Sequence, residues 1–195
     1  MNTSRDLKKE LRAAALARRD ALDAAWRVDV GQRLAAHADA LAPSPSSGGV
    51  VSGFWPMRSE MDVRPLMTAL AARGARIALP AILDKTTIVF REYLPDAAMI
   101  DMGFGTMGPD EEAPVLDPDV MLVPLAAFDA RGHRIGYGAG YYDRAIARLK
   151  AKGRRPRLIG IAFDCQQVEH VPDEAHDQPL SEILTEAGLR RFDGV

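Results

Sequence analysis

The sequence predicts a three-layer α/β fold, in which helices cover both faces of a mostly parallel sheet. Short and nearly continuous apolar segments such as Val120–Pro124 alternate with segments of helical periodicity, a pattern typical of parallel strands that are buried on both faces. The length of 195 residues fits one domain. We therefore expect a single domain over residues 1–195, with a helical N-terminal part (1–42) and an α/β body (50–195).

The N-terminal part is expected to contain two helices. Ser4 precedes apolar residues that recur at three- to four-residue spacing and is expected to cap the first helix. Asp23 is expected to cap a second helix that runs from Ala24 to Leu41. The segment Pro43–Gly49 is rich in Ser, Pro and Gly and predicts a loop before the α/β body.

The rest of the chain alternates between strand and helix patterns. Asp62 is expected to cap a helix from Val63 to Arg73, which ends at Gly74 in a left-handed conformation. A Gly- and Pro-rich loop is expected at Met102–Pro118, and a further helix at Tyr141–Lys152. The expected strands are Val50–Trp55, Arg76–Pro80, Thr86–Tyr93, Val120–Pro124, Leu158–Phe163 and Ile183–Leu184.

Composition excludes several classes of protein. Apolar residues make up 47% of the chain, charged residues 27%, and the net charge is −2, which argues against a disordered protein. The longest bulky apolar run, Val120–Phe128, is nine residues, whereas a membrane helix needs about 20. The first residues carry no secretory pattern, so we expect a cytoplasmic protein without a membrane partner. Cys165 is the only cysteine, which excludes an intramolecular disulfide and a thiolate zinc cluster.

Positive charge is concentrated in one segment. Between Arg131 and Arg157, nine Lys and Arg residues stand against Asp143 alone, whereas the rest of the chain is acidic. This distribution favours a small anionic ligand over a nucleic acid. A structural explanation stays open for four of these cations, which fit the last turns of a helix: Arg144, Arg148, Lys150 and Lys152.

The glycine-rich segment in Asp129–Asp143 is the first candidate for a ligand site. Ligands of such sheets bind beyond the carboxyl ends of the strands, which indicates this segment and the loop Trp55–Asp62. Gly136, Gly138 and Gly140 alternate just before a predicted helix, so backbone N–H groups and the helix N-terminus could bind a polyphosphate. A glycine-rich turn without a ligand is the alternative explanation.

Two familiar phosphate loops are excluded by spacing. No glycine–lysine pair occurs in the chain, so there is no Walker A motif. Tyr141 stands where the dinucleotide fingerprint requires its last glycine. An NAD-dependent oxidoreductase therefore remains only as a weaker alternative.

Individual charged and aromatic residues allow a functional and a structural interpretation. Asp143 is either an acid at a helix start or a ligand of Mg²⁺ beside phosphates. Lys8 and Arg12 share one helix face, which is either solvated or able to contact an anion. Trp55 and Glu60 are either core and surface residues, or they stack on and hydrogen-bond to a flat heterocycle.

Several segments resemble the 5-formyltetrahydrofolate cyclo-ligase family, also called 5,10-methenyltetrahydrofolate synthetases. They are Lys8–Arg12, Met57–Asp62, Leu122–Arg144, Leu158–Phe163 and His176–Pro179. The resemblance covers nearly the whole chain, and the glycine segment is its most specific part. It implies a fold of the NagB/RpiA/CoA-transferase-like kind. It also implies ATP- and Mg²⁺-dependent cyclisation of 5-formyltetrahydrofolate to 5,10-methenyltetrahydrofolate, with release of ADP and phosphate.

The resemblance also assigns roles to residues. Arg134 and Tyr142 are the expected catalytic residues, and Asp143 and Asp177 the expected metal ligands. The expected ATP-binding residues are Lys8, Arg12, Arg134, Ile135, Gly136, Tyr137, Gly138, Ala139, Gly140, Tyr141 and Tyr142. The expected folate-binding residues are Trp55, Glu60, Tyr137, Gly138 and Tyr141.

One departure from the family changes the expected phosphate contacts. Some relatives carry basic side chains where this chain has Tyr137 and Ala139, so backbone amides, Arg134, Lys8 and Arg12 are expected to bind the phosphates. A folate- or nucleotide-binding paralogue without turnover is the alternative that this departure leaves open. The expected partners are small molecules only, and a monomer is expected.

Overall fold

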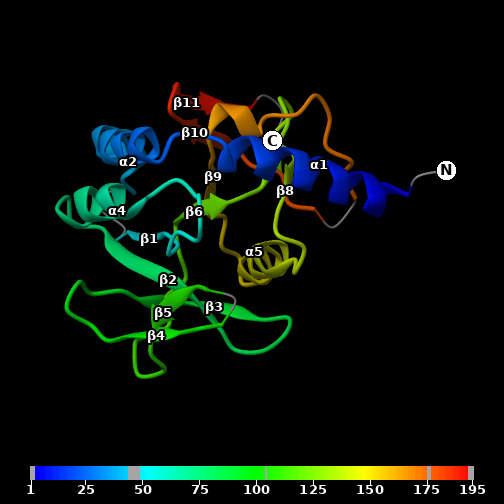
Figure 1. Cartoon of the computed structure of the whole chain (residues 1–195). Helices are drawn as coiled ribbons and strands as arrows, with labels where there is room; N and C mark the ends of the chain where they lie inside the picture. Colours follow the sequence, from blue (N-terminus) through cyan, green and yellow to red (C-terminus); the bar gives the residue numbers. More distant parts are fainter. Residues whose placement is uncertain (1–2, 44–48, 104, 175–176, 193–195) are drawn as a thin grey trace.

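The computed structural model describes residues 3–43, 49–103, 105–174 and 177–192. Seven strands form the central sheet: β1 (Val50–Ser52), β2 (Arg76–Ile82), β3 (Ile88–Glu92), β6 (Val120–Pro124), β9 (Arg157–Ile161), β10 (Glu182–Thr185) and β11 (Gly188–Arg191). Their order is β11-β10-β9-β6-β1-β2-β3 (Figure 1). The five inner strands pair in parallel, and the edge strands β3 and β11 are antiparallel to their neighbours. The predicted mostly parallel sheet is confirmed.

Helices lie on both faces of this sheet, as the sequence predicts. They are α1 (Ser4–Asp20), α2 (Ala24–Arg33), the 3₁₀ helices η1 (Leu34–His37) and η3 (Asp164–Gln166), α3 (Ala38–Leu41), α4 (Arg64–Ala71) and α5 (Tyr141–Ala151). Figure 1 shows α2 and α4 on one side of the sheet and α5 on the other. None of the helices in the described ranges is long and apolar enough to cross a membrane.

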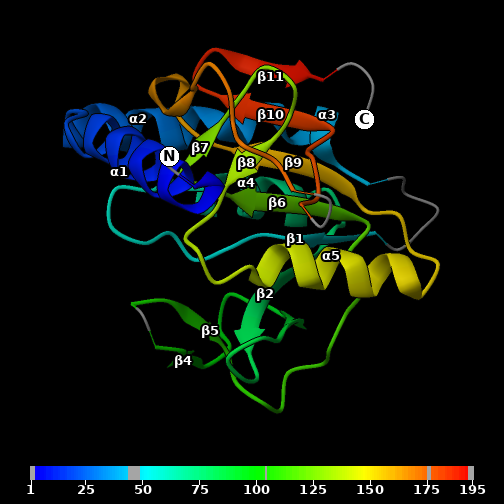
Figure 2. The ribbon, with the colours of Figure 1, turned by 90° about the vertical axis from the view of Figure 1, so that its right-hand side faces the viewer.

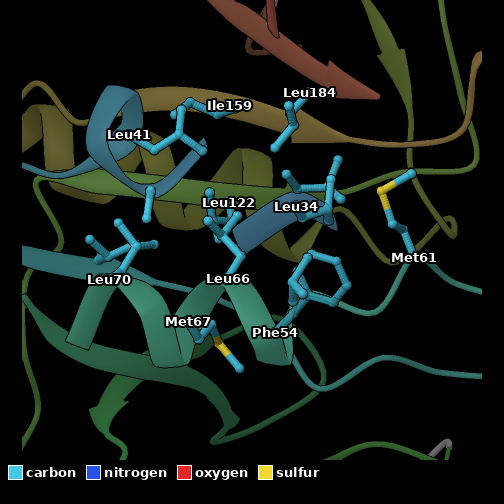
Figure 3. Close-up of a cluster of buried hydrophobic side chains, with 14 of the residues drawn as sticks. Leu34, Leu41, Phe54, Met61, Leu66, Met67, Leu70, Leu122, Ile159 and Leu184 are labelled. Atoms are coloured by element: carbon cyan, nitrogen blue, oxygen red, sulfur yellow. The ribbon is translucent and has the colours of Figure 1, made fainter. Parts of the chain in front are cut away.

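Alternating side chains of the strands build two separate cores. On one face, Leu122 of β6 packs with Leu34 and Leu66 from the helices that cover it (Figure 3). On the other face, the neighbouring Met121 packs with Ile146 of α5. This period of two buries both faces of the sheet, which explains why the strands of the sequence are nearly continuous apolar runs.

The N-terminal helices differ in detail from the prediction. Thr3 rather than Ser4 caps α1, because the Thr3 hydroxyl accepts the Asp6 N–H while the Asp6 carboxylate accepts the Thr3 N–H. Asp23 caps α2 as predicted. The single helix expected over residues 24–41 is instead divided into α2, η1 and α3. Residues 44–48 of the predicted loop lie outside the described residues.

Helix α4 begins one residue later than predicted. Its N-cap is Val63, and Asp62 nevertheless accepts the Arg64 N–H at 3.0 Å. Gly74 has a φ of +88°, the left-handed conformation predicted for it.

Three short antiparallel elements were not predicted. The hairpin β4 (Met99–Asp101) and β5 (Met107–Pro109) partly occupies the expected loop Met102–Pro118. The hairpin β7 (Ala127–Phe128) and β8 (Arg134–Ile135) precedes the glycines, and β11 pairs with β10. Several predicted strands are shorter or shifted; Val50–Trp55, for example, ends at Ser52. Strands of two to four residues are too short to show a period of two in the sequence.

Candidate active site

The two loops indicated by the sequence meet at the carboxyl ends of β1 and β6. The Tyr137 hydroxyl from the glycine segment donates a hydrogen bond to Glu60 Oε1 from the loop after β1. Glu60 Oε2 accepts the Met57 N–H at 2.8 Å. Burial raises the pKa of Glu60, and the bonds from Tyr137 and Met57 and the charge of Arg19 oppose that rise. The carboxylate is therefore held by donors on both oxygens.

The glycine segment lies at the start of α5. Gly138 and Gly140 have φ values of +101° and +65°, which L side chains rarely adopt. Gly140 is also the N-cap of α5, so the positive end of the helix faces this segment. Ile135 is buried in front of the glycines, whereas Ala139 is exposed and its carbonyl accepts a bond from Arg144.

A buried aspartate holds the hairpin that leads into the glycines. Asp129 is fully buried and accepts hydrogen bonds from the backbone N–H groups of Arg131, His133 and Val171. The Arg131 guanidinium adds two more bonds to the same carboxylate. These five bonds set the direction of β8 and hence the position of the segment that follows it.

Arg134 lies in a buried ion pair at the base of the site. Its side chain is 5% exposed, and Nη2 lies 2.8 Å from Asp143 Oδ1. Arg134 also donates to the Gln178 carbonyl, and the Gln178 N–H donates to Asp143 Oδ1 at 3.1 Å. Because Asp177 directly precedes Gln178, this arrangement brings both predicted metal ligands to the same end of α5.

Both predicted cations of α1 face the glycine segment. Arg12 Nε donates to the Gly136 carbonyl at 2.7 Å, and its guanidinium lies beside Gly138. Lys8 Nζ lies 2.7 Å from Asp177 Oδ2. Figure 2 shows α1 lying across the β7–β8 hairpin. The face with Lys8 and Arg12 is thus turned toward the body of the protein rather than toward solvent.

The aromatic candidates occupy different surroundings. Trp55 is half-buried, with Tyr93 at a centroid distance of 6.2 Å and the Arg64 guanidinium 5.3 Å from its ring. Tyr141 Oη donates to the Asp84 carbonyl at 3.3 Å. In the described part of the chain, the buried Tyr142 hydroxyl has no hydrogen-bond partner. Burial and the charge of Glu60 raise the pKa of Tyr142, so this group stays a neutral hydroxyl.

Asp143 and Asp177 are too few to hold a metal ion alone, but they could do so together with a bound phosphate. The described residues contain no group of three or more His, Cys, Asp or Glu side chains that could hold a metal ion. Mg²⁺ requires less from a protein, because it binds one or two carboxylates together with phosphate oxygens and water. Asp143 and Asp177 supply such hard oxygen ligands, so their chemistry fits Mg²⁺ bound together with a phosphate.

Sequence reasoning missed two buried charged residues of this region, Arg19 and Asp129. Arg19 at the end of α1 is 3% exposed and donates to Ser59 Oγ and Tyr137 Oη. Its spacing from Arg12, seven residues on the same helix face, is the one pattern that could have identified it. Nothing in the sequence distinguishes Asp129 from an ordinary turn residue.

The fold of this chain has counterparts among solved structures. The NMR structure of Aquifex aeolicus 5,10-methenyltetrahydrofolate synthetase matches with a TM-score of 0.76 and 28% identity, covering 97% of this chain and 94% of that one. The fold is that of an α/β enzyme of this synthetase type.

Sequence comparisons agree. Curated 5-formyltetrahydrofolate cyclo-ligases from Haemophilus influenzae and Escherichia coli K12 are 34% and 30% identical to this chain. The matches cover 67% and 86% of this chain, and 72% and 94% of those relatives. The model of the 5-formyltetrahydrofolate cyclo-ligase family matches residues 4–186, and the chain belongs to this family. The family, the fold and the enzyme class predicted from the sequence are confirmed.

Proposed function

We propose that the site catalyses the ATP- and Mg²⁺-dependent cyclisation of 5-formyltetrahydrofolate to 5,10-methenyltetrahydrofolate, releasing ADP and phosphate. The observation that carries this proposal is the contact between Tyr137 and Glu60. It joins a glycine segment suited to phosphates to a half-buried carboxylate suited to a heterocycle. Two reactants bound to these groups would lie next to each other, as transfer between them requires.

The nucleotide side consists of backbone and cationic groups. The N–H groups around Gly138, the N-terminus of α5 and the guanidinium of Arg12 would bind the phosphates of ATP. Lys8 would add its charge from the same face of α1. Arg134 is already paired with Asp143, so we assign it to holding Asp143 and the base of the glycine segment as well as to neutralising phosphate charge.

The folate side consists of Glu60 and Trp55. Glu60 would accept N–H donors of the pterin, and the ring of Trp55 would stack beside it. The Tyr142 hydroxyl, which lacks a partner among the described residues, would donate a hydrogen bond to the reacting group.

The reaction follows from what the formyl group lacks. Its oxygen is a poor leaving group until it is phosphorylated, so the formyl oxygen attacks the γ-phosphorus and ADP leaves. Nitrogen 10 then attacks the activated carbon and loses its proton, the ring closes, and phosphate departs with the former formyl oxygen. The protein positions the reactants and neutralises charge, with little covalent chemistry of its own. Asp143 and Asp177 would hold Mg²⁺, which would supply further neutralisation of the phosphate charge.

A spectrophotometric assay tests this function. The purified protein is incubated with 5-formyltetrahydrofolate, ATP and Mg²⁺, and the absorbance of the methenyl product is followed. We expect product only when all three are present. Binding of folate or ATP without any product would indicate the non-catalytic paralogue instead, and hydride transfer to or from a nicotinamide would indicate an oxidoreductase.

A further inference from the structure

Arg19 is a buried cation between three segments that are distant in the sequence. It lies in the last turn of α1, is 3% exposed, and donates from Nε to Ser59 Oγ at 2.9 Å and from Nη1 to Tyr137 Oη at 2.7 Å. Both bonds go to hydroxyl groups and neither to a carboxylate. The charge of the guanidinium instead acts on the nearby carboxylate of Glu60, which it stabilises.

The donors of Arg19 determine the direction of the hydrogen bonds around it. A guanidinium only donates, and a tyrosine hydroxyl has one proton to give. Since the Tyr137 oxygen accepts from Arg19, its own O–H is directed to Glu60 Oε1. Ser59 is oriented in the same way, because it accepts from Arg19 and donates to Asp20. Both hydrogen bonds in the chain Arg19–Tyr137–Glu60 are thus donated in the same direction, from Arg19 toward Glu60.

This direction preserves Glu60 as an acceptor. Burial raises the pKa of Glu60 and so favours its protonated form, whereas the Tyr137 O–H, the Met57 N–H and the charge of Arg19 favour the carboxylate. The charge of Glu60 in turn raises the pKa of the Tyr137 and Tyr142 hydroxyls. Without Arg19, the orientation of the Tyr137 hydroxyl depends on Glu60 alone, and Glu60 loses the positive charge of Arg19, which stabilises its carboxylate.

We propose that Arg19 is a positioning residue for folate, which fixes Tyr137 as a donor to Glu60 and so keeps Glu60 ready to accept N–H groups of the pterin. This proposal rests on the proposed function, in which Glu60 binds the pterin. Arg19 lies on the same face of α1 as Lys8 and Arg12, at positions 8, 12 and 19. One face of this helix therefore contributes to both substrate sites, with its last turn assigned to the folate.

Replacement of Arg19 by Met tests the proposal by separating the two substrates. For Arg19→Met we expect the KM for 5-formyltetrahydrofolate to rise at least about tenfold and the KM for ATP to stay within about twofold. The acid limb of the pH profile of kcat/KM for folate should move to higher pH, because Glu60 is then harder to ionise. Arg19→Lys retains one donor and should restore part of the folate affinity. Equal increases of both KM values would indicate general distortion and overturn the proposal.

Arg18→Met is the matched control. Arg18 is the neighbouring residue on α1, is exposed, and donates to the carbonyls of Cys165 and Gln167. Its replacement removes the same charge from the same helical turn, so both KM values and the pH profile should be those of the parent protein.

Tyr137→Phe keeps the proposal falsifiable if Arg19→Met fails to fold. Tyr137 is 41% exposed, so loss of its hydroxyl should leave the fold intact. We expect the same rise of the folate KM and the same shift of the acid limb as for Arg19→Met. The double variant should be no worse than the more impaired single variant, because both break one chain of hydrogen bonds. An unchanged folate KM in Tyr137→Phe would overturn the proposal.

Glu60→Gln separates this proposal from the proposed function. If Glu60→Gln leaves the folate KM unchanged, the assignment of the pterin to Glu60 is wrong. If Glu60→Gln raises the folate KM while Arg19→Met and Tyr137→Phe do not, the pterin assignment stands and only the positioning role is wrong.

Discussion

Lys8 Nζ lies 2.7 Å from Asp177 Oδ2, although the two residues are 169 positions apart. Their side chains are 18% and 19% exposed, and Glu174 lies 3.8 Å from the same ammonium group. The pair joins α1 to the segment that precedes β10. A cation proposed for the phosphates and a carboxylate proposed for the metal are therefore adjacent before any ligand binds.

Replacement of Lys8 by Met should weaken ATP binding selectively. We expect the KM for ATP to rise about tenfold, roughly 1.4 kcal/mol, because one charge at the phosphates is lost, while the KM for folate stays within about twofold. Initial rates at varied ATP and fixed saturating folate measure this. Lys9→Met is the control, since Lys9 is exposed on the same turn and should leave both constants unchanged. A rise in the folate KM alone would contradict the assignment.

Asp143→Asn should lower kcat at least about tenfold, which corresponds to roughly 1.4 kcal/mol in the barrier. The change removes the charge that we assign to Mg²⁺ while retaining an acceptor for Arg134. Turnover is measured across a Mg²⁺ titration, with the thermal midpoint as a check on folding. Asp117→Asn is the control, because Asp117 forms a similar ion pair with Lys152 and has a similar exposure, 27% against 26%. Full activity of Asp143→Asn at saturating Mg²⁺ would remove Asp143 from the metal site.

Glu60→Gln should change how stability depends on pH. Burial raises the pKa of Glu60 in the folded protein above its usual 4.5. At pH values between the pKa of Glu60 in the unfolded chain and its pKa in the folded protein, the folded protein therefore binds more protons than the unfolded chain. The contribution of Glu60 to the free energy of unfolding therefore falls as the pH rises through this interval.

Since Gln does not titrate, the stability of Glu60→Gln relative to the parent should increase as the pH rises above 4.5, the usual pKa of a glutamate. Urea unfolding at a series of pH values measures the difference. Glu111→Gln, at an exposed position, should show no such trend. A relative stability that falls over this range would mean that the pKa of Glu60 is lowered rather than raised.

Asp129→Ala should destabilise the protein by about 3 kcal/mol, because it leaves several buried N–H groups without an acceptor. Urea denaturation followed by circular dichroism measures the free energy of unfolding. Asp84→Ala removes the aspartate of an exposed turn, where Asp84 accepts the Thr86 N–H at 2.7 Å, and should cost less than about 1 kcal/mol. Equal losses in the two variants would contradict the role of Asp129 in holding the β7–β8 hairpin.

The sequence predicted the elements whose patterns are long enough to read. Val120–Pro124 and the helix that starts at Tyr141 occupy their predicted positions. The strand is a run of five apolar residues and the helix has three turns, so each carries a pattern long enough to be recognised in the sequence. The hairpins and β11 were missed, since pairing partners rather than periodicity define such short strands.

The residues of the site likewise divide into those that the sequence predicted and those that it did not. The glycine segment and the loop around Glu60 were recognised from local residues, and their contact follows from strand order. Arg18 and Arg19 are chemically identical neighbours, however, and the spacing from Arg12 distinguishes them only once it is known which face of α1 packs on the body. Asp129 likewise gains its importance from Val171, a residue far away in the sequence. Interactions of this kind depend on packing that a local pattern does not encode.

Several of the groups that attach helix α1 to the body also serve ligands, beside the bonds of Arg18 and a small apolar cluster that includes Leu11 and Ala15. The fully buried residues of α1 are Ala15 and Arg19, so little apolar surface holds it in place, and it is expected to be among the first elements to detach when the protein opens locally. Substrates that contact Lys8 or Arg12, or that bind only while α1 is docked on the body, stabilise the docked position of α1 by their binding free energy. Cleavage by a protease in the connection after Asp20 should therefore slow as ATP and folate accumulate, which would make the lifetime of this enzyme depend on the supply of its own reactants.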